Sequence, residues 1–418
     1  MFEKHSLGSL VERQQGGGTP ERSNPRFWSG TIPWASVKDF ADNQLILNST
    51  EESITQQGLR ASSTNLIPAG TPLVCTRMAV GRCAISSYDV AINQDVKALF
   101  PKSSVNPRYL LRLLDSLKFH AESVSVGSTV KGIRISDLLG IQTPIAPSHE
   151  QPKITQILNT LDTQIQKTEA LIAKLEKIKE GLLHDLLTRG IDHNGQLRPA
   201  PEQAPELYKE SALGLIPNDW EAKTVGELGT WRGGSTPSKS NPKFWPSQGL
   251  LWVSPKDLGQ DIIDTTEDKV SGLAAGVANL TIFPPETVLV VFRSGILRRK
   301  LPVVKVLKNF TVNQDIKALL PADEISKGFI HYLLQGHAKG ILNSSLKAGT
   351  TVESLDFRFF SSYSVPLPPL DEQEIISARL GSIESRLAKE AKLIEKLKTK
   401  KIGLMDDLLT GRVRVTSL

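Results

Sequence analysis

Residues 149–187 read HEQPKITQILNTLDTQIQKTEALIAKLEKIKEGLLHDLL. Apolar residues return every three and then four positions, which is the heptad spacing of a helix that packs against another helix. With Gln151 as position a, the apolar residues of this seam include Leu158, Leu161, Ile165, Ile172 and Leu175. Because such a long stripe is buried only against a second helix, the segment predicts a partner.

A second stretch with the same pattern lies at the C-terminal end of the chain. Residues 371–411 read DEQEIISARLGSIESRLAKEAKLIEKLKTKKIGLMDDLLTG, and an offset of 222 residues brings them into the same heptad frame. The apolar residues of this second seam include Leu380, Ile383, Leu387, Ile394 and Leu397. Polar residues also coincide, since Lys179 and Lys401 both fall at position a. The two stretches are therefore predicted to pair as an antiparallel coiled coil.

The helix repeat is the end of a longer duplication. The repeated segments are GGGTPERSNPRFW (16–28) with GGSTPSKSNPKFW (233–245), INQDVKALFP (92–101) with VNQDIKALLP (312–321), and GSTVKGI (127–133) with GTTVESL (349–355). The offset between copies drifts from 217 to 222 residues, which indicates small insertions in surface loops. The pattern is that left by duplication of one folded unit.

Each copy predicts a mixed α/β domain followed by a long helix, so the expected fold class is α+β with a pseudo-twofold internal repeat. Strands are expected at 71–76, 287–292 and 301–307, and helices at 108–118 and 327–342. Ser148 and Asp371 are expected to cap the two long helices. The expected boundaries are 1–147 for domain 1, 148–190 for the central helical region, 191–216 for a connector, 217–369 for domain 2 and 370–418 for the C-terminal helical region.

The composition is typical of a globular protein of the cytoplasm. The chain has 39% hydrophobic and 22% charged residues, and it contains no apolar run long enough to cross a membrane and no signal-peptide core. Cys75 and Cys83 are too few for a disulfide framework, and we expect them to pack in a strand-turn-strand. A net charge of +6 and a pI near 9.1 favour a polyanionic partner.

The sequence lacks the motifs of the common catalytic and cofactor sites. It contains no GxGxxG, no GxxxxGK[ST] and no HExxH, and neither of its Pro-Pro pairs has the setting of an amino-methyltransferase motif. The seven histidines are scattered along the chain. The chain is therefore expected to recognise a ligand and to organise partner molecules, with no catalytic residue, metal ion or cofactor of its own.

Duplex DNA is the expected ligand of the two similar domains, because repeated basic and hydroxyl side chains suit its phosphates and base edges. The candidate residues are Thr19, Arg26, Lys38, Arg77 and Arg82 in domain 1 and Thr236, Lys243, Lys256, Arg293 and Arg298 in domain 2. Each single charge is equally well explained as a solvated surface residue, and recurrence in both domains favours the group. The glycine-rich entries at 16–19 and 233–236 are expected to be plain loops, although glycine also permits close approach to a ligand. The paired tryptophans are expected to be core.

Several motifs in order resemble the specificity subunit of a type I restriction-modification enzyme. Each long helix begins after a similar proline-rich segment, IAPSHEQPK (145–153) and PLPPLDEQE (366–374), and only His149 departs from the usual pattern. Each ends in a similar way, KIKEGLLHDLLTRGID (177–192) and KKIGLMDDLLTGRV (400–413), and the connector contains LGLIPNDW (213–220). The resemblance covers essentially the whole chain.

The resemblance implies two target recognition domains, each of which binds one half of a bipartite site in double-stranded DNA. It implies that the helices act as a spacer and dock two methyltransferase subunits, and through them restriction subunits with helicase and nuclease activity. S-adenosylmethionine is then expected on the methyltransferase partner. Two other interpretations remain: an endonuclease or methyltransferase in its own right, and a coiled-coil scaffold with protein-binding heads. Activity of the isolated chain separates the first from DNA recognition, and the salt dependence of DNA binding separates the second.

Overall fold

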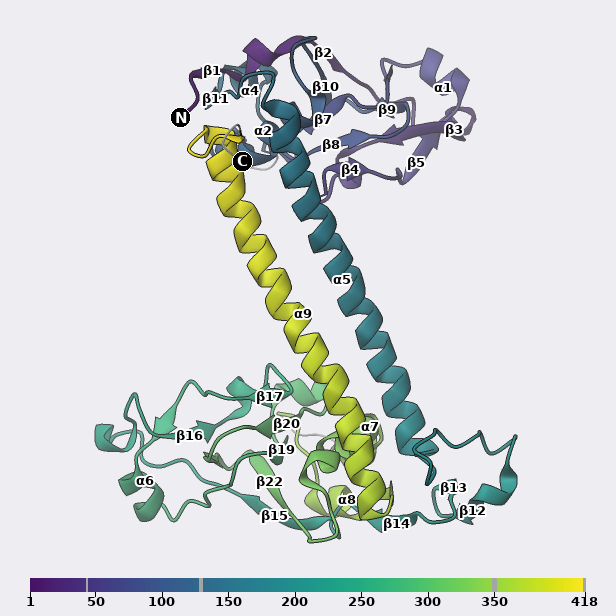
Figure 1. Cartoon of the computed structure of the whole chain (residues 1–418), viewed down its shortest axis with the longest axis vertical. Helices are drawn as coiled ribbons and strands as arrows, with labels where there is room; N and C mark the ends of the chain where they lie inside the picture. Colours follow the sequence, from purple (N-terminus) through teal and green to yellow (C-terminus); the bar gives the residue numbers. More distant parts are fainter. Residues whose placement is uncertain (43, 128–130, 348–351, 416–418) are drawn as a thin grey trace. The chain divides into compact units, whose positions relative to one another are not determined.

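The computed structural model describes residues 1–42, 44–127, 131–347 and 352–415, and it divides into two compact units (Figure 1). Unit 1 combines Met1–Ala170 with Lys392–Leu418, and unit 2 is Leu171–Ala391. Each unit contains one α/β domain and a part of both long helices. The repeated segments at 127–133 and 349–355 fall partly outside the described residues.

The domain of unit 1 is built on a five-stranded sheet and a four-stranded sheet. The first sheet has the order β2 (Val11–Gly16), β10 (Val96–Pro101), β7 (Pro72–Cys75), β8 (Cys83–Ser86) and β4 (Ile46–Leu47). The second has the order β5 (Glu52–Ile54), β3 (Trp28–Ala35), β9 (Val90–Ile92) and β6 (Asn65–Ile67). Strands β7 and β8 form the expected antiparallel hairpin, and every residue in them is buried, including both cysteines. The predicted packing role of Cys75 and Cys83 is confirmed.

One helix packs on the first sheet, and several short elements complete the α/β domain of unit 1. Helix α2 (Pro107–Ser116) packs on β7 and β8, and its buried face carries the leucine spacing that predicted it. The remaining short elements are α1 (Gln56–Arg60), α3 (Lys118–Ser123), α4 (Ile135–Gly140) and the antiparallel pair β1 (Lys4–Ser6) and β11 (Gln142–Pro144). One expected helix at 108–118 is thus two helices that meet at Leu117.

Unit 2 repeats this architecture. Its five-stranded sheet has the equivalent order β15 (Gly229–Gly233), β22 (Ile316–Pro321), β19 (Thr287–Val291), β20 (Val303–Val306) and β17 (Ile262–Ile263). Its second sheet has three strands, β18 (Lys269–Val270), β16 (Leu250–Val253) and β21 (Phe310–Val312). The fourth strand is reduced to a single bridge between Phe283 and Phe310. The expected strands at 287–292 and 301–307 are confirmed.

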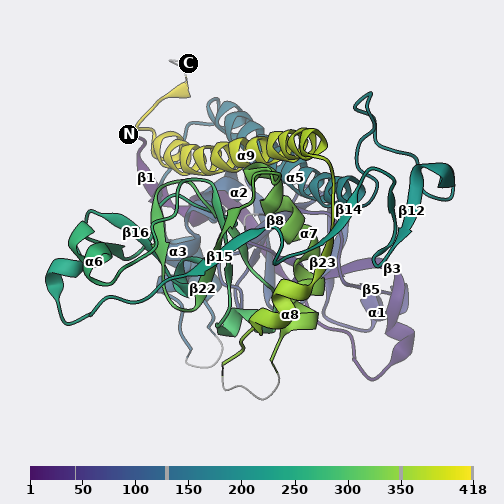
Figure 2. The same cartoon turned by 90° about the horizontal axis from the view of Figure 1, so that it is seen from below.

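The helices of unit 2 also match those of unit 1. Helix α7 (Lys327–Ser345) packs on β19 and β20. It lies beside α8 (Phe357–Ser362) (Figure 2). The other elements are α6 (Gly272–Val277), the pair β14 (Glu221–Thr224) and β23 (Ser364–Leu367), and the connector hairpin β12 (Tyr208–Ser211) and β13 (Gly214–Pro217). The two α/β domains and two long helices confirm the predicted fold class.

The long helices are α5 (Gln151–Thr188) and α9 (Leu370–Thr410). In unit 1, the Lys401 and Lys398 ammonium groups of α9 lie 2.8 and 2.9 Å from carboxylate oxygens of Asp162 and Glu169 of α5. In unit 2, the Lys179 ammonium lies 2.6 Å from Glu384. Residue numbers rise along one helix as they fall along the other, so the helices run antiparallel. None of the predicted seam residues is classed as exposed.

The repeated Glu-Gln at the start of each helix has a structural role. Gln151 Oε1 accepts a hydrogen bond from the Asn106 amide at 2.9 Å, and Gln373 Oε1 accepts one from the Ser326 amide at 2.9 Å. Each glutamine therefore ties the start of a long helix to the start of α2 or α7. Glu150, the preceding residue, is buried and accepts hydrogen bonds from Arg414, which lower the pKa of its carboxyl.

The prediction of helix caps is wrong at both helices. Helix α9 already begins at Leu370, so Asp371 lies in its first turn, and α5 begins only at Gln151, three residues after Ser148. At both helices the proline carbonyl accepts the first i→i−4 hydrogen bond, Pro147 from the Gln151 amide at 3.3 Å and Pro369 from the Gln373 amide at 3.0 Å, so the cap position falls on the proline. In the part of the chain that the structure describes, no helix has the length and apolar character needed to span a membrane.

Candidate nucleic-acid interface

A polar cluster lies where three strands of domain 1 end. Thr19 follows β2, Arg77 follows β7, and Gln94 and Asp95 connect β9 to β10. The Thr19 hydroxyl donates to Gln94 Oε1 at 2.6 Å, Gln94 Nε2 donates to Asp95 Oδ2 at 3.4 Å, and Arg77 Nη1 lies 3.5 Å from Asp95 Oδ1. Asp95 is buried, whereas Gln94 and the Arg77 side chain are exposed. We call these four residues the domain 1 cluster.

Domain 2 carries the same four residue types at equivalent positions, but there the arginine is joined to the aspartate through the backbone. The Thr236 hydroxyl donates to Gln314 Oε1 at 2.7 Å, and Gln314 Nε2 donates to Asp315 Oδ2 at 3.4 Å. The amide of Arg293 donates to the Asp315 carbonyl at 3.3 Å, and Arg293 is exposed. The domain 2 cluster is therefore Thr236, Arg293, Gln314 and Asp315. Both clusters offer a hydroxyl, an amide and a guanidinium, which are the groups that read base edges and phosphates.

Sequence reasoning missed Gln94 and Gln314 as members of these clusters. They stand in the repeated segment NQD, which served only as a sign of duplication. In each domain the Asn side chain holds the turn, because Asn93 Oδ1 accepts from the Asp95 amide at 3.1 Å and Asn313 Oδ1 from the Asp315 amide at 3.0 Å. The signal available in the sequence was the repeated triplet itself, in which a glutamine stands between two turn-forming residues, Asn and Asp.

The glycine-rich entries pack against the chain itself. A Cβ atom on Gly17 would lie 1.8 Å from the Ile92 carbonyl oxygen, and one on Gly234 would lie 1.8 Å from the Val312 carbonyl oxygen. Both positions therefore require glycine for the internal fit of the loop. The loop is further held by tryptophan, because Trp34 Nε1 donates to the Gly18 carbonyl at 3.1 Å. These loops place Thr19 and Thr236 beside the glutamines.

The paired tryptophans belong to the core of each domain. Trp28 and Trp34 meet edge to face at 5.2 Å, and Trp245 and Trp252 do so at 5.0 Å. A cation at the equivalent position of each repeat covers the outer ring: Arg22 lies 4.0 Å from Trp28 and Lys239 lies 3.5 Å from Trp245. Neither of these cations was among the predicted residues. Their own carboxylate partners, Glu52 and Asp268, hold them over the rings.

Arg82 and Arg298 have different surroundings from Arg77 and Arg293. Arg82 donates to the Phe40 carbonyl at 3.0 Å and to Asp42 Oδ2 at 2.7 Å, and its side chain is only 34% exposed. Lys118 also binds Asp42, and this hydrogen bond is the main cause that lowers the pKa of the Asp42 carboxyl. Arg298 is exposed and paired with Glu353. The structure thus separates Arg82 from the domain 1 cluster.

The other predicted basic residues lie outside the two clusters. Arg26 and Lys243 stand in equivalent single turns, in which Asn24 and Asn241 accept hydrogen bonds from their amides at 3.1 Å, and both side chains are exposed. Lys38 is exposed. Lys256 pairs with Glu267 at 2.9 Å and with Asp268 at 3.1 Å.

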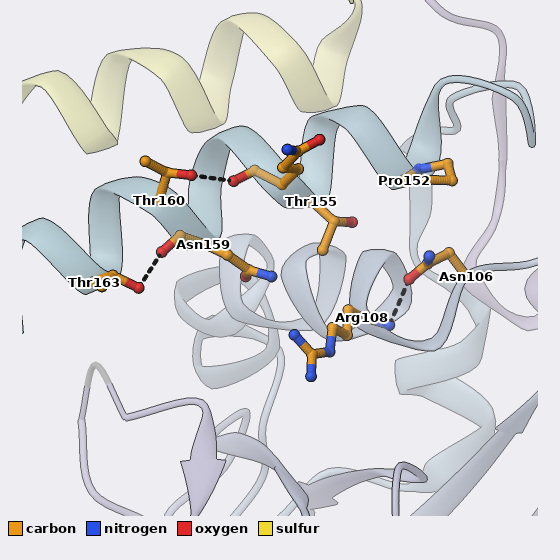
Figure 3. A pocket seen from close by; sticks show the side chains of 8 residues that line it. Asn106, Arg108, Pro152, Thr155, Asn159, Thr160 and Thr163 are labelled. Carbon is orange, nitrogen blue, oxygen red and sulfur yellow. Dashed lines mark hydrogen bonds between the residues drawn. The ribbon is translucent and has the colours of Figure 1, made fainter.

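A hollow of about 390 Å³ lies between the start of α2 and the outer face of α5 in unit 1 (Figure 3). Asn106 and Arg108 border it on one side, and Thr155, Asn159 and Thr163 border it on the other. The threonine hydroxyls are bonded to their own helix, since Thr155 donates to the Gln151 carbonyl and Thr163 to that of Asn159. The helix face is therefore neutral and polar, unlike the two clusters.

Comparison with known proteins gives one family. The family model "Type I restriction modification DNA specificity domain" matches residues 1–177 and 217–399. The specificity subunit of the Escherichia coli enzyme EcoR124I/EcoR124II is 33% identical over 178 residues, 43% of this chain and 44% of that protein. The MjaIX specificity subunit of Methanocaldococcus jannaschii is 25% identical over 96% of this chain and 91% of that protein.

Solved structures share the fold. The S subunit of a type I restriction-modification system from M. genitalium superposes with a TM-score of 0.62 at 16% identity, over 98% of this chain and 96% of that one. A chain from a study of complex assembly and conformational transition of the type I system gives 0.55 at 17% identity, over 99% and 98%. Both neighbours match nearly the full length of the chain.

Proposed function

The chain belongs to the type I restriction-modification DNA specificity family as a specificity subunit, and we propose that each of its domains binds one half of a bipartite site in double-stranded DNA. The observation that carries this proposal is the duplicated cluster of threonine, glutamine, aspartate and arginine. Two copies of one surface suit a polymeric ligand that carries two similar but separate half-sites. The relatives are specificity subunits, which supports recognition as the role of this chain.

The glutamine and the arginine of each cluster are suited to different contacts with DNA. Thr19 donates to one lone pair of Gln94 Oε1, and Asp95 accepts one hydrogen of Nε2, so the Gln94 side chain is held in one orientation. A second lone pair of Oε1 and a second N–H remain for a ligand. A fixed amide of this kind reads adenine, whereas an exposed guanidinium such as Arg77 reads guanine or binds phosphate. The buried Asp95 orients both side chains, so it acts as a positioning residue.

The test compares Arg77→Ala and Arg293→Ala with Arg82→Ala in the full chain. We expect the first two to weaken binding to duplex DNA. If the residue contacts phosphate, the loss is uniform across sequences and the salt slope falls by about one unit; if it contacts a base, one position of the site relaxes at a cost of about 1–3 kcal/mol. Arg82→Ala should lower thermal stability and leave specificity unchanged, because Arg82 binds Phe40 and Asp42. Unchanged affinity, salt slope and specificity in both Arg77→Ala and Arg293→Ala would refute the assignment.

We further propose that two methyltransferase subunits dock on the helix pair, with restriction subunits attached through them, in the cytoplasm. S-adenosylmethionine would be held by the methyltransferase, so the isolated chain should transfer no methyl group until that subunit is added. The hollow beside α5, with its neutral helix face, is a candidate contact. Thr160→Arg with Thr163→Arg should then weaken co-purification of the partner, whereas Glu176→Arg with Glu180→Arg, at two exposed positions farther along α5, should weaken it less.

A further inference from the structure

A short ribbon of backbone pairs lies beside the domain 1 cluster. Gly132 bridges both Arg77 and Val126, the Met78 amide donates to the Lys131 carbonyl at 2.9 Å, and the Ile133 amide donates to the Thr76 carbonyl at 2.8 Å. We call residues 76–78, 126 and 131–133 the domain 1 ribbon. Two of its side chains, Met78 and Val126, are large, apolar and 65% and 72% exposed.

Domain 2 has the equivalent ribbon. Arg293 bridges Ser354, and Leu346 bridges Leu355. The Ser294 amide donates to the Glu353 carbonyl at 3.0 Å, which repeats the bond from Met78 to Lys131. The domain 2 ribbon is residues 292–294, 346 and 353–355. The shared hydrogen bond makes Met78 and Ser294 equivalent, although one is apolar and the other is a hydroxyl residue.

Met78 holds an unfavourable backbone conformation. Its φ is 63°, and the Ala79 amide donates to the Arg77 carbonyl at 2.7 Å, which closes a three-residue turn around Met78. Residues other than glycine rarely adopt this region, and methionine gains nothing there from its side chain. Ser294 has an extended φ of −175°. The exposed side chain of Met78 makes no contribution to the core that would offset this strain, and strained residues cluster at sites that bind ligands.

We propose that Met78 is a specificity-determining residue, which contacts the C5-methyl group of a thymine when the domain 1 ribbon enters the major groove. This inference rests on the proposed function. The major groove accepts a β-ribbon, and it displays the thymine methyl group to apolar side chains. Arg77 on the same ribbon supplies the cation that holds the DNA beside Met78. Because domain 2 has Ser294 at this place, the two half-sites differ at the corresponding base pair.

The first experiment uses Met78→Gly in cells that carry the full chain and its modification subunit, with the methylated motif determined by methylome sequencing. Glycine adopts a positive φ freely, so the variant should unfold at the same temperature as the parent or a higher one. We expect one A·T position in one half of the motif to become degenerate. The other half and the spacer should stay unchanged.

The second experiment isolates the methyl group. In binding assays with the purified complex, uracil replaces each thymine of the affected half-site in turn. At one thymine the parent should lose about fourfold in affinity, which corresponds to one buried methyl group. The affinity of the Met78→Gly complex should not change with that replacement. Val277→Gly removes another exposed apolar side chain, on α6 of domain 2, and should change no position of the motif.

Three outcomes are distinguishable. If the parent complex methylates a bipartite motif and Met78→Gly keeps every position of it, Met78 does not determine specificity, while the proposed function stands. An equal loss of binding to all sequences would also overturn the inference, because the residue would then act on general affinity. If the parent complex recognises no bipartite motif, the proposed function itself fails.

Discussion

The duplication allows single residues to be compared within one chain. Leu111 in α2 and His331 in α7 occupy equivalent positions, and both are buried. Neither ring nitrogen of His331 meets a hydrogen-bond partner among the described residues. Burial of the imidazole lowers the pKa of His331 from 6.5 to about 4. The histidine is therefore a neutral core residue where the other copy has a leucine.

This difference predicts an acid sensitivity. Below pH 6.5 the unfolded chain protonates His331, whereas the folded chain does so only near pH 4, so stability falls as the pH drops between these values. The loss amounts to at most about 3 kcal/mol. His331→Leu should remove this part of the pH dependence, as measured by urea unfolding from pH 7 to pH 4.5. An equally steep loss in the variant would show that His331 is not its source.

At the scale of residues, the sequence showed which side chains recur in both domains, but not which partners each of them contacts. Arg77 and Arg82 looked alike because both recur in the second domain. Their difference comes from Asp42 and Asp95, which lie far from them along the chain and reach them only through the fold. Local spacing carries no information on such partners, so the separation of the two arginines could not be predicted.

The helix pair illustrates what a heptad pattern contains. It predicted both helices and their buried faces, because the period of the apolar residues follows directly from helix geometry. It also showed that Lys179 and Lys401 fall at equivalent inner positions. It did not identify their partners, because the frame within one helix does not determine the register against the other. The structure supplies them: Lys401 meets Asp162 in unit 1, and Lys179 meets Glu384 in unit 2.

The Lys179–Glu384 pair is more buried than the Lys398–Glu169 pair, so we expect the two ion pairs to contribute differently to the free energy of unfolding. Burial acts to raise the pKa of Glu384, but hydrogen bonds from Lys179 and Tyr332 outweigh it and lower that pKa. Glu384→Gln should therefore destabilise unit 2 by about 1–3 kcal/mol, because it leaves the largely buried Lys179 without its charge partner. The control is Glu169→Gln, which breaks the exposed pair with Lys398 and should cost less than about 0.5 kcal/mol. Equal effects of both changes in denaturant titrations would contradict this.

At the scale of the whole molecule, the internal repeat carried most of the prediction. Two similar segments at a nearly constant offset require two similar folds, and the matching strand orders of the two five-stranded sheets follow. Loss of the fourth strand of the second sheet in unit 2 could not be predicted. It depends on how the chain around Phe283 pairs with Phe310, and short pairings of this kind leave no alternating pattern in the sequence.

If the two domains bind two half-sites, as proposed, the helices are long enough to set the distance between them. With 38 and 41 residues, they span about 60 Å each. If they act as a spacer, one extra heptad in both, inserted after Ala170 and after Ala391, adds about 10 Å of rise. We expect the gap between the half-sites to widen by about one to three base pairs, since the helices need not run parallel to the DNA.

The half-sites themselves should not change, because the insertion leaves both clusters and both ribbons intact. Methylome sequencing of cells with the lengthened chain and its modification subunit measures gap and half-sites together. A heptad inserted in α5 alone is the matched control, since helices lengthened unequally cannot keep both the Lys401–Asp162 pair and the Lys179–Glu384 pair. That variant should lose stability and methylation. A lengthened pair that methylates the original motif with its original gap would show that the helices do not measure the distance.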